Sequence, residues 1–300
     1  MLVKHWSDTH RGIAFFIAAM AFFAALDTSV KYVSAFLPLV TTLWLRFAFQ
    51  SCMTAGMLLP SRGRAAWRVN RLGALALRGV LMALSSAVAF MGLKFMPVAE
   101  FTAIMMLTPM MITLVAAYLL KEGVSWQRWL LLVGALVGAL LVIQPGAAHF
   151  GWAVLLPLLL IALNVGYQFL TRNLAADVEA GSVHLYSGIF AMLVVSLALP
   201  FGWQTPQGWD IWALVLLLSF FSTIGHYMMI LAYGLASPAT LSPYLYLQLA
   251  FATLGGWLLF SHTPNALAWT GMGLIALCGI ISARLPGPVS RIPVETEPQL

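Results

Sequence analysis

The sequence predicts an all-α integral membrane protein, with ten transmembrane helices arranged as two inverted five-helix repeats around a central cavity. Three observations predict this fold. Of the 300 residues, 62% are hydrophobic and 8% are charged, against roughly 45–50% and about 25% in a soluble domain. Apolar runs of about 20 residues, the length that crosses a bilayer as a helix, recur along the chain. The two halves of the chain also match each other weakly.

Ten spans follow one another with short connections. The first apolar run follows basic residues, as in a signal peptide, but it is long and lacks a small-residue cleavage site, so we expect a retained helix. Pro109, Pro157 and Pro243 fall inside spans, where each removes a backbone donor and predicts a kink. Hydropathy places the spans near 12–35, 38–59, 73–93, 97–120, 126–144, 151–171, 182–200, 210–234, 238–260 and 265–283.

The basic residues predict the orientation. If the N-terminus is cytoplasmic, Lys94 alone falls on the outer side, and the positive-inside rule favours that arrangement. We therefore expect a multi-pass protein of the cell inner membrane, with both termini and a disordered tail at 285–300 in the cytoplasm. The net charge of +6 then reflects topology and not nucleic-acid binding. The inner side holds Lys4, Arg11, Arg62, Arg64, Arg68, Arg71, Lys121, Arg128, Arg172, Arg284 and Arg291.

The two halves align without a gap around the fourth and fifth spans of each. Pro97 in "KFMPVAEF" aligns with Pro238 in "LASPATLS", and each proline opens the fourth span of a five-helix unit. Because five is odd, the second unit is inverted, a recurring design of secondary transporters with the substrate site near the midplane. We expect repeats at 1–147 and 148–284. The further matches pair Ala135, Leu136 and Gly138 with Ala276, Leu277 and Gly279.

Over residues 12–283 the sequence resembles the drug/metabolite transporter superfamily, in the group built from paired EamA domains. The resemblance rests on "KFMPVAEF" before a proline-bearing helix, the "LLKEGV" end and the glycine-rich "LLVGALVGALLV". Their counterparts depart from the pattern at "LLFSHTPN", which lacks the usual acidic residue. The resemblance implies a transporter, and the similar layout of YddG-type exporters of aromatic amino acids places amino acids first among cargoes.

Four charged residues lie inside the spans, where charge is costly and marks a candidate functional site. At about 1.5 Å rise per residue, Asp27 and Arg46 both sit roughly 10–12 Å below the outer surface. Lys31 lies one turn beyond Asp27, and Glu100 enters the fourth span just below that surface. These groups either present both charges to a zwitterionic substrate or neutralise one another. Arg78, near a helix end, is interpreted as a snorkelling interface residue.

Neutral polar and aromatic residues form the remaining candidate substrate contacts. Each has a structural alternative, such as hydrogen bonding between helices or packing at the membrane interface. Histidine remains a candidate proton carrier, because it titrates near neutral pH. These candidates are Trp44 on the second span, Asn164, Tyr167 and Gln168 on the sixth, His226 and Tyr227 on the eighth, and Tyr244 and Gln248 on the ninth.

The sequence thus predicts a secondary carrier that exports amino acids, including aromatic and other neutral ones, by alternating access. The alternative is a carrier of another small metabolite, such as a purine, a drug-like cation or a nucleotide derivative. An intramembrane enzyme is a distant alternative, because neither H-E-x-x-H nor G-x-S-x-G occurs. We expect no cofactor and no metal. The expected partners are a small-molecule substrate and the lipid bilayer; proton coupling and the choice between monomer and homodimer stay open.

Overall fold

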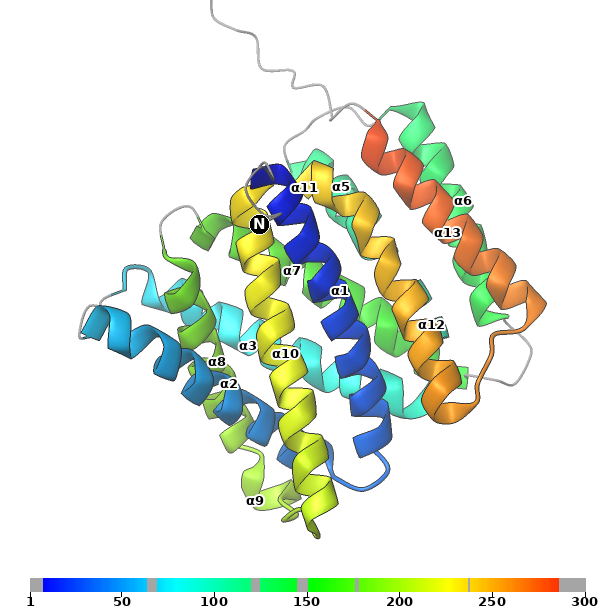
Figure 1. The fold of residues 1–300 in the computed structure, drawn as a ribbon. Coiled ribbons are helices and arrows are strands. Elements are labelled where there is room, and N and C mark those ends of the chain that lie inside the picture. Colours follow the sequence, from blue (N-terminus) through cyan, green and yellow to red (C-terminus); the bar gives the residue numbers. More distant parts are fainter. Residues whose placement is uncertain are drawn as a thin grey trace, which may run out of the picture.

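The computed structural model describes residues 8–63, 69–119, 125–144, 151–175, 178–236 and 238–285, and these ranges contain helices and no strand (Figure 1). Seven described segments are long and apolar enough to cross a bilayer, and Val98–Met111 and Ala180–Ser196 are shorter apolar helices. The first half contains α1 (Asp8–Val33), α2 (Leu39–Arg62), α3 (Leu72–Phe95), α4 (Val98–Met105), α5 (Thr108–Leu119) and α6 (Trp126–Ile143). The second half contains η2 (Gly151–Val154), α7 (Leu155–Ala175), α8 (Ala180–Ser196), α9 (Leu199–Gly202), α10 (Trp209–Leu235), α11 (Pro238–Leu241), η3 (Ser242–Tyr246), α12 (Leu247–Phe260) and α13 (Ala266–Arg284).

The fourth and ninth spans are broken, where the sequence predicts continuous kinked helices. Pro109 lies in the first turn of α5, and Pro243 lies in η3 between α11 and α12. Proline is tolerated in a first helical turn, where no intrahelical donor is missing, so each begins a new helical segment. Pro157 lies in the first turn of α7 for the same reason, and the predicted kink inside the sixth span is wrong.

The helices pair across the two halves in a reciprocal pattern. The first span of each half packs along the third span of the other, as α1 on α10 and α3 on α7. Equivalent spans also meet, as α2 with α8, α4 with α12, and α6 with α13. In Figure 1 the α6 and α13 pair lies on one side of the bundle and the α2 and α8 pair on the other.

Glycines bring α6 and α13 into close backbone contact. A Cβ added at Gly271 would lie 2.4 Å from the carbonyl oxygen of Gly138, so neither helix has room for a larger residue at this crossing. Small residues are the usual means by which membrane helices approach one another. The glycine-rich fifth and tenth spans therefore pack on each other within the chain.

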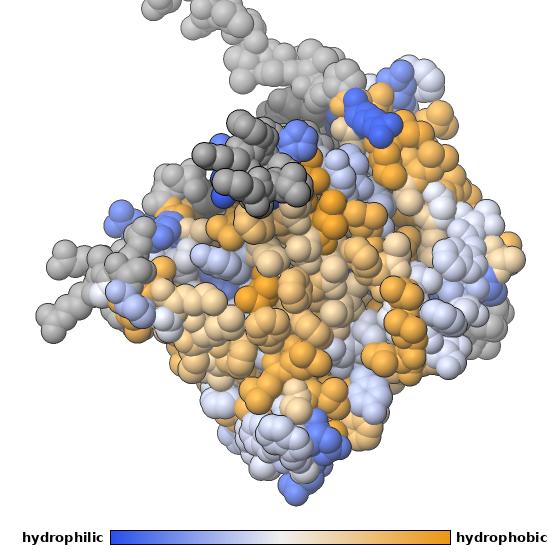
Figure 2. Space-filling view, viewed as in Figure 1, coloured by the Kyte–Doolittle hydropathy of each residue, from blue (hydrophilic) through white to orange (hydrophobic). Residues whose placement is uncertain are grey.

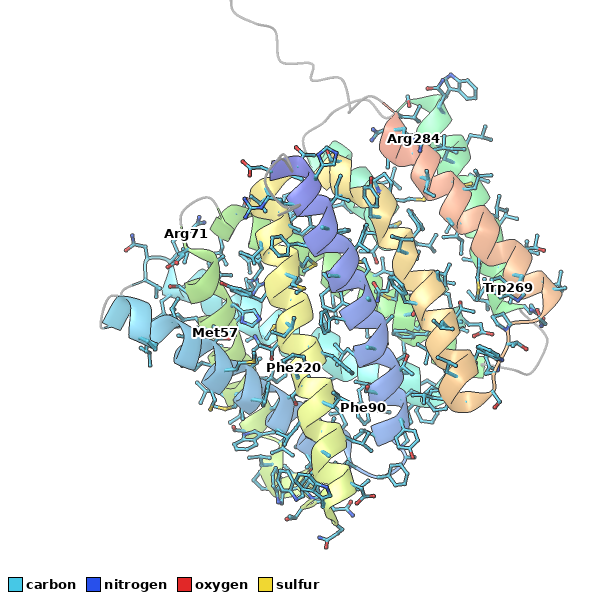
Figure 3. The ribbon with its side chains drawn as sticks, in the orientation of Figure 1. Met57, Arg71, Phe90, Phe220, Trp269 and Arg284 are labelled. Carbon is cyan, nitrogen blue, oxygen red and sulfur yellow. The ribbon has the colours of Figure 1, made fainter. Side chains whose placement is uncertain are left out.

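The surface divides into an apolar belt and two polar ends. Figure 2 shows a broad hydrophobic band between more hydrophilic residues at the two ends of the bundle. We call the end at which α1 begins the proximal end, and the end at which α1 stops, at Val33, the distal end. Arg71 and Arg284 lie at the proximal end (Figure 3). The belt faces lipid, because apolar side chains such as Leu140 and Leu258 are exposed on it.

Candidate functional site

A central cavity of about 230 Å³ lies between the two halves of the bundle. Its wall is built from α1, α2, α3, α4 and the start of α5 in the first half, and from α7, α10, η3 and α12 in the second. Clefts between helices are a common location for ligand sites in bundles. Seven residues predicted from the sequence line this one cavity: Asp27, Arg46, Asn164, Tyr167, Gln168, His226 and Gln248.

The two charged residues of the cavity are held by neutral partners and not by each other. The Gln248 amide donates a hydrogen bond of 3.2 Å to Asp27 Oδ2. The Arg46 guanidinium donates one of 2.7 Å to Ser86 Oγ and stacks 4.6 Å above the Phe47 ring. No ion pair joins Asp27 to Arg46 within the described part of the chain. A carboxyl group and a guanidinium therefore both line the cavity, which is the arrangement that the zwitterion hypothesis invokes.

Neutral polar groups of α7 and α10 add hydrogen-bonding capacity to the wall. The His226 Nδ1 lies 2.8 Å from the Ser222 carbonyl oxygen, which can only accept, so Nδ1 carries the proton and the neutral ring keeps Nε2 as an acceptor. Asn164 and Gln168 make no side-chain hydrogen bond with the described residues, so the alternative of interhelical bonding does not account for them. Both amides remain available to a ligand.

Three further polar atoms at the cavity wall are buried without a hydrogen-bond partner among the described residues: Arg46 Nε, Ser85 Oγ and Thr102 Oγ1. An unsatisfied buried polar group costs roughly 1–3 kcal/mol, so such groups favour a bound polar ligand or water. The sequence did not single out Ser85, Ser86 or Thr102, because hydroxyl residues in membrane helices usually bond to their own backbone.

The rest of the wall is apolar and suits a flat ring. Phe90 and Phe101 are buried beside the cavity, and Phe23 meets the His226 ring edge-on with 4.8 Å between centroids. Aromatic rings favour such contacts with other rings. Methionine side chains are flexible and adapt to irregular ligands. Five of them line the cavity: Met20, Met82, Met105, Met106 and Met229.

Arg78 is not a snorkelling residue, and that interpretation is wrong. Its side chain is 1% exposed and donates hydrogen bonds to Thr171 Oγ1 at 2.9 Å, to Ser187 Oγ at 2.6 Å and to the Tyr167 hydroxyl. It also lies 4.4 Å from the centre of the Tyr167 ring. Arg78 thereby fixes the orientation of one aromatic residue of the cavity wall, through contacts with the second half of the chain.

Lys31 and Glu100 do not line the central cavity, so the predicted single path is wrong for them. They line a separate pocket of about 500 Å³ at the distal end. The Lys31 ammonium donates to the carbonyl oxygens of Leu93 and Met96, at 3.0 and 2.8 Å, and does not pair with Asp27. Residues four apart share a helix face, but Asp27 lines the central cavity and Lys31 lines the distal pocket.

Three other candidates lie outside both cavities, contrary to the predicted path. The Trp44 indole N–H donates to Ser196 Oγ at 2.9 Å, which turns the ring toward α8. Tyr227 faces the His184 ring across 6.1 Å, and Tyr244 packs in an apolar cluster around Phe16. Trp44 and Tyr227 are both directed at α8, which does not line the central cavity, and Tyr244 packs beside cavity residues such as Met20 and Leu245 without lining the cavity itself.

A buried polar cluster lies between α2 and α8. The sequence did not predict it, because its members appear there only as isolated polar residues. The Thr54 hydroxyl lies 2.8 Å from His184 Nδ1, and the Gln50 amide donates to the His184 carbonyl oxygen at 3.2 Å. His184 Nε2 and Gln50 Oε1 have no partner among the described residues. The cluster joins equivalent spans of the two halves, because α2 and α8 pack on each other.

Known proteins of similar sequence are transporters. A riboflavin transporter of Brucella anthropi is 26% identical, covering 92% of this chain and 99% of that protein. An S-adenosylmethionine uptake transporter of Rickettsia felis is 24% identical over 85% of this chain and 86% of that protein. A pseudopaline exporter of Pseudomonas aeruginosa is 25% identical over 91% of this chain and 96% of that protein. A solved crystal structure shares the fold, with a TM-score of 0.67 at 17% identity over 91% of this chain and 96% of that one.

The model of the EamA-like transporter family matches residues 10–144, the part that runs from α1 to the end of α6. The relatives are named for riboflavin, S-adenosylmethionine and pseudopaline, and amino acids are not among these named cargoes. Residues 10–144 are thus similar to the EamA-like transporter family, and the relatives that match most of the chain are named as transporters.

Proposed function

We propose that this protein is a secondary transporter of a heterocyclic metabolite, which binds in the central cavity between Asp27 and Arg46. The observation that carries the proposal is the placement of these two groups, each held by a neutral partner and both facing one cavity with an aromatic and methionine wall. A carboxylate accepts ring or amine N–H groups, and a guanidinium donates to carbonyl or carboxylate oxygens.

The cargo named for two of the relatives supports a heterocycle over a plain amino acid. Riboflavin and S-adenosylmethionine both contain a flat heteroaromatic ring system with hydrogen-bonding edges. Such a ring would stack on Phe90 or Phe101, while its polar edge or attached groups meet Asp27, Arg46 and the free amides of α7. This proposal replaces amino-acid export by the alternative that the sequence left open, another small metabolite.

The proposal includes the arrangement of the chain in the membrane. Residues 1–147 and 148–284 would be the two inverted units, and the reciprocal packing of α1 on α10 and α3 on α7 supports this division. The proximal end, with Arg71, Arg128 and Arg284, would face the cytoplasm of a bacterial inner membrane, as the positive-inside rule favours. Alternating access would then expose the cavity to either side.

Transport into liposomes that contain the purified protein tests the proposal. The panel is riboflavin, S-adenosylmethionine, adenine and L-phenylalanine, each labelled, with empty liposomes as the baseline. We expect at least one heterocyclic compound to enter above the baseline and L-phenylalanine not to compete with it. Transport of L-phenylalanine alone would reject the heterocycle proposal and restore amino acids as the cargo.

Two substitutions connect transport to the cavity. Arg46→Gln removes the cation while keeping a donor for Ser86, and we expect it to reduce transport of the heterocyclic compound. Asp210→Asn is the matched control, because this carboxylate is exposed in the first turn of α10 and lines neither cavity. Equal transport by both variants would show that Arg46 has only a structural role.

A further inference from the structure

The distal pocket shares segments of its lining with the central cavity. Residues close together in α1, at the end of α3 and in α4 are divided between the two cavities. Val30, Leu93 and Phe101 line the central cavity, whereas Lys31, Phe95 and Glu100, one or two residues away, line the distal pocket. The two cavities therefore lie close to each other along these segments.

Lys31 is bonded to one lining residue of each cavity. Its ammonium donates to the carbonyl oxygens of Leu93, which lines the central cavity, and of Met96, which lines the distal pocket, at the end of α3. A cation at the C-terminal carbonyls of a helix is favourable. Two of the three ammonium protons are used in this way, so one remains for another acceptor.

Glu100 is a carboxyl group in this pocket with one oxygen that has no hydrogen-bond partner among the described residues. The residue is 4% exposed, and its Oε1 lies 2.8 Å from His262 Nε2. Its Oε2 is buried and has no hydrogen-bond partner among the described residues. A buried carboxylate oxygen without a donor costs roughly 1–3 kcal/mol or more, so a cationic N–H donor in the pocket would be stabilised there.

The rim of the pocket offers polar groups for the remainder of a ligand. Gln144 and Asn265 donate amide hydrogen bonds to each other, at 2.9 and 3.2 Å, across the ends of α6 and α13. Thr263 is exposed beside them. Like the central cavity, the pocket therefore contains one carboxyl group, Glu100, and one basic group, Lys31. Each of the two bonds to a residue of another helix or loop.

We propose that the distal pocket is a second ligand site, which holds the cationic group of a small organic metabolite on Glu100 next to the central cavity. The class of ligand rests on the proposed function, since both cavities contain the same pair of charges. A metabolite that passes between the distal side of the membrane and the central cavity would occupy this site first or last, with Lys31 near its acidic group.

Protection of a cysteine from alkylation tests this site without measuring transport. Thr263→Cys places a thiol at the pocket, in a Cys52→Ser background because Cys52 is exposed while Cys278 is buried. S-adenosylmethionine, which has an amine, a sulfonium and a carboxylate, is the probe. We expect it to slow maleimide labelling of the detergent-purified protein. Gln207→Cys, exposed at the distal end outside the pocket, is the matched control and should not be protected.

Two further substitutions separate the distal site from the central cavity. Glu100→Gln keeps an acceptor for His262 but removes the charge, so half-protection should require about tenfold more S-adenosylmethionine, from the loss of a charge-assisted hydrogen bond. Asp27→Asn alters the central cavity alone and should leave protection unchanged. Equal thermal unfolding of the Glu100→Gln and parent proteins confirms that folding is intact.

Two results would overturn the distal site. One is labelling of Thr263→Cys at the same rate with and without the probe. The other is protection that Asp27→Asn abolishes and Glu100→Gln leaves intact, because the thiol would then report the central cavity. Failure of the proposed function is a different result: no heterocyclic compound enters liposomes, whatever the alkylation shows.

Discussion

Replacement of Asp27 by asparagine tests the central cavity most directly. The asparagine side-chain oxygen can still accept the 3.2 Å hydrogen bond from Gln248, so the local packing is kept. The charge is lost, and the second carboxylate oxygen becomes an NH₂ donor facing the ligand. A hydrogen bond to a charged group contributes about 1.5–3 kcal/mol net. At about 1.4 kcal/mol per tenfold, the substrate should bind roughly 10- to 150-fold more weakly.

The assay is the concentration dependence of uptake in proteoliposomes, with the heterocyclic compound that the panel identifies. Asp27→Asn should raise the half-saturating concentration by this factor, while the exposed control Asp210→Asn should match the parent protein. Thermal unfolding of the two variants should coincide. If correctly folded Asp27→Asn transports with the parent's half-saturating concentration, Asp27 has a structural role with Gln248, and the reasoning is refuted.

Three further predictions concern the scaffold around the cavities. Gly271→Ala should lower the unfolding temperature in detergent, because its methyl group would meet the Gly138 carbonyl oxygen at 2.4 Å, whereas Gly273→Ala, with open space around it, should not. Asn265→Ala removes the side chain that accepts from a backbone N–H at the start of α13, and thermal unfolding should show a loss of about 1 kcal/mol. Arg78→Leu should destabilise the protein strongly, since three hydrogen bonds between α3 and the second half are lost; unfolding like that of the parent would contradict the buried role.

The fold could be predicted because the bilayer leaves few choices. Backbone groups in lipid must be satisfied within the chain, so each long apolar run has to be a helix. The broken fourth and ninth spans were harder, although Pro109 and Pro243 mark both. A proline inside an apolar run signals an irregularity, but whether it kinks one helix or begins another depends on packing against α7 and the other half.

The candidate site also contains residues that the sequence alone could identify and residues that only the packing of the helices reveals. Asp27 and Arg46 stood out because charge is rare inside spans. Ser85 and Thr102 gave no signal, because hydroxyl groups in these helices commonly bond to the carbonyl four residues earlier, as Thr28 does. The interpretation of Arg78 was wrong because its hydrogen-bond partners lie on α7 and α8. The position of Arg78 near the end of its own span gives no information about residues on those helices.

The unequal lengths of the helices have a consequence for the surrounding lipid. At about 1.5 Å per residue, the 26 residues of α1 and the 27 of α10 extend about 39 and 40 Å, while the 18 of α6 and the 19 of α13 extend about 27 and 28 Å. The hydrocarbon core of a typical bilayer is about 30 Å thick. A helix longer than this core can be accommodated by tilting, and a shorter one by local thinning of the bilayer. We therefore expect the bilayer to be thinner beside α6 and α13 than beside α1 and α10.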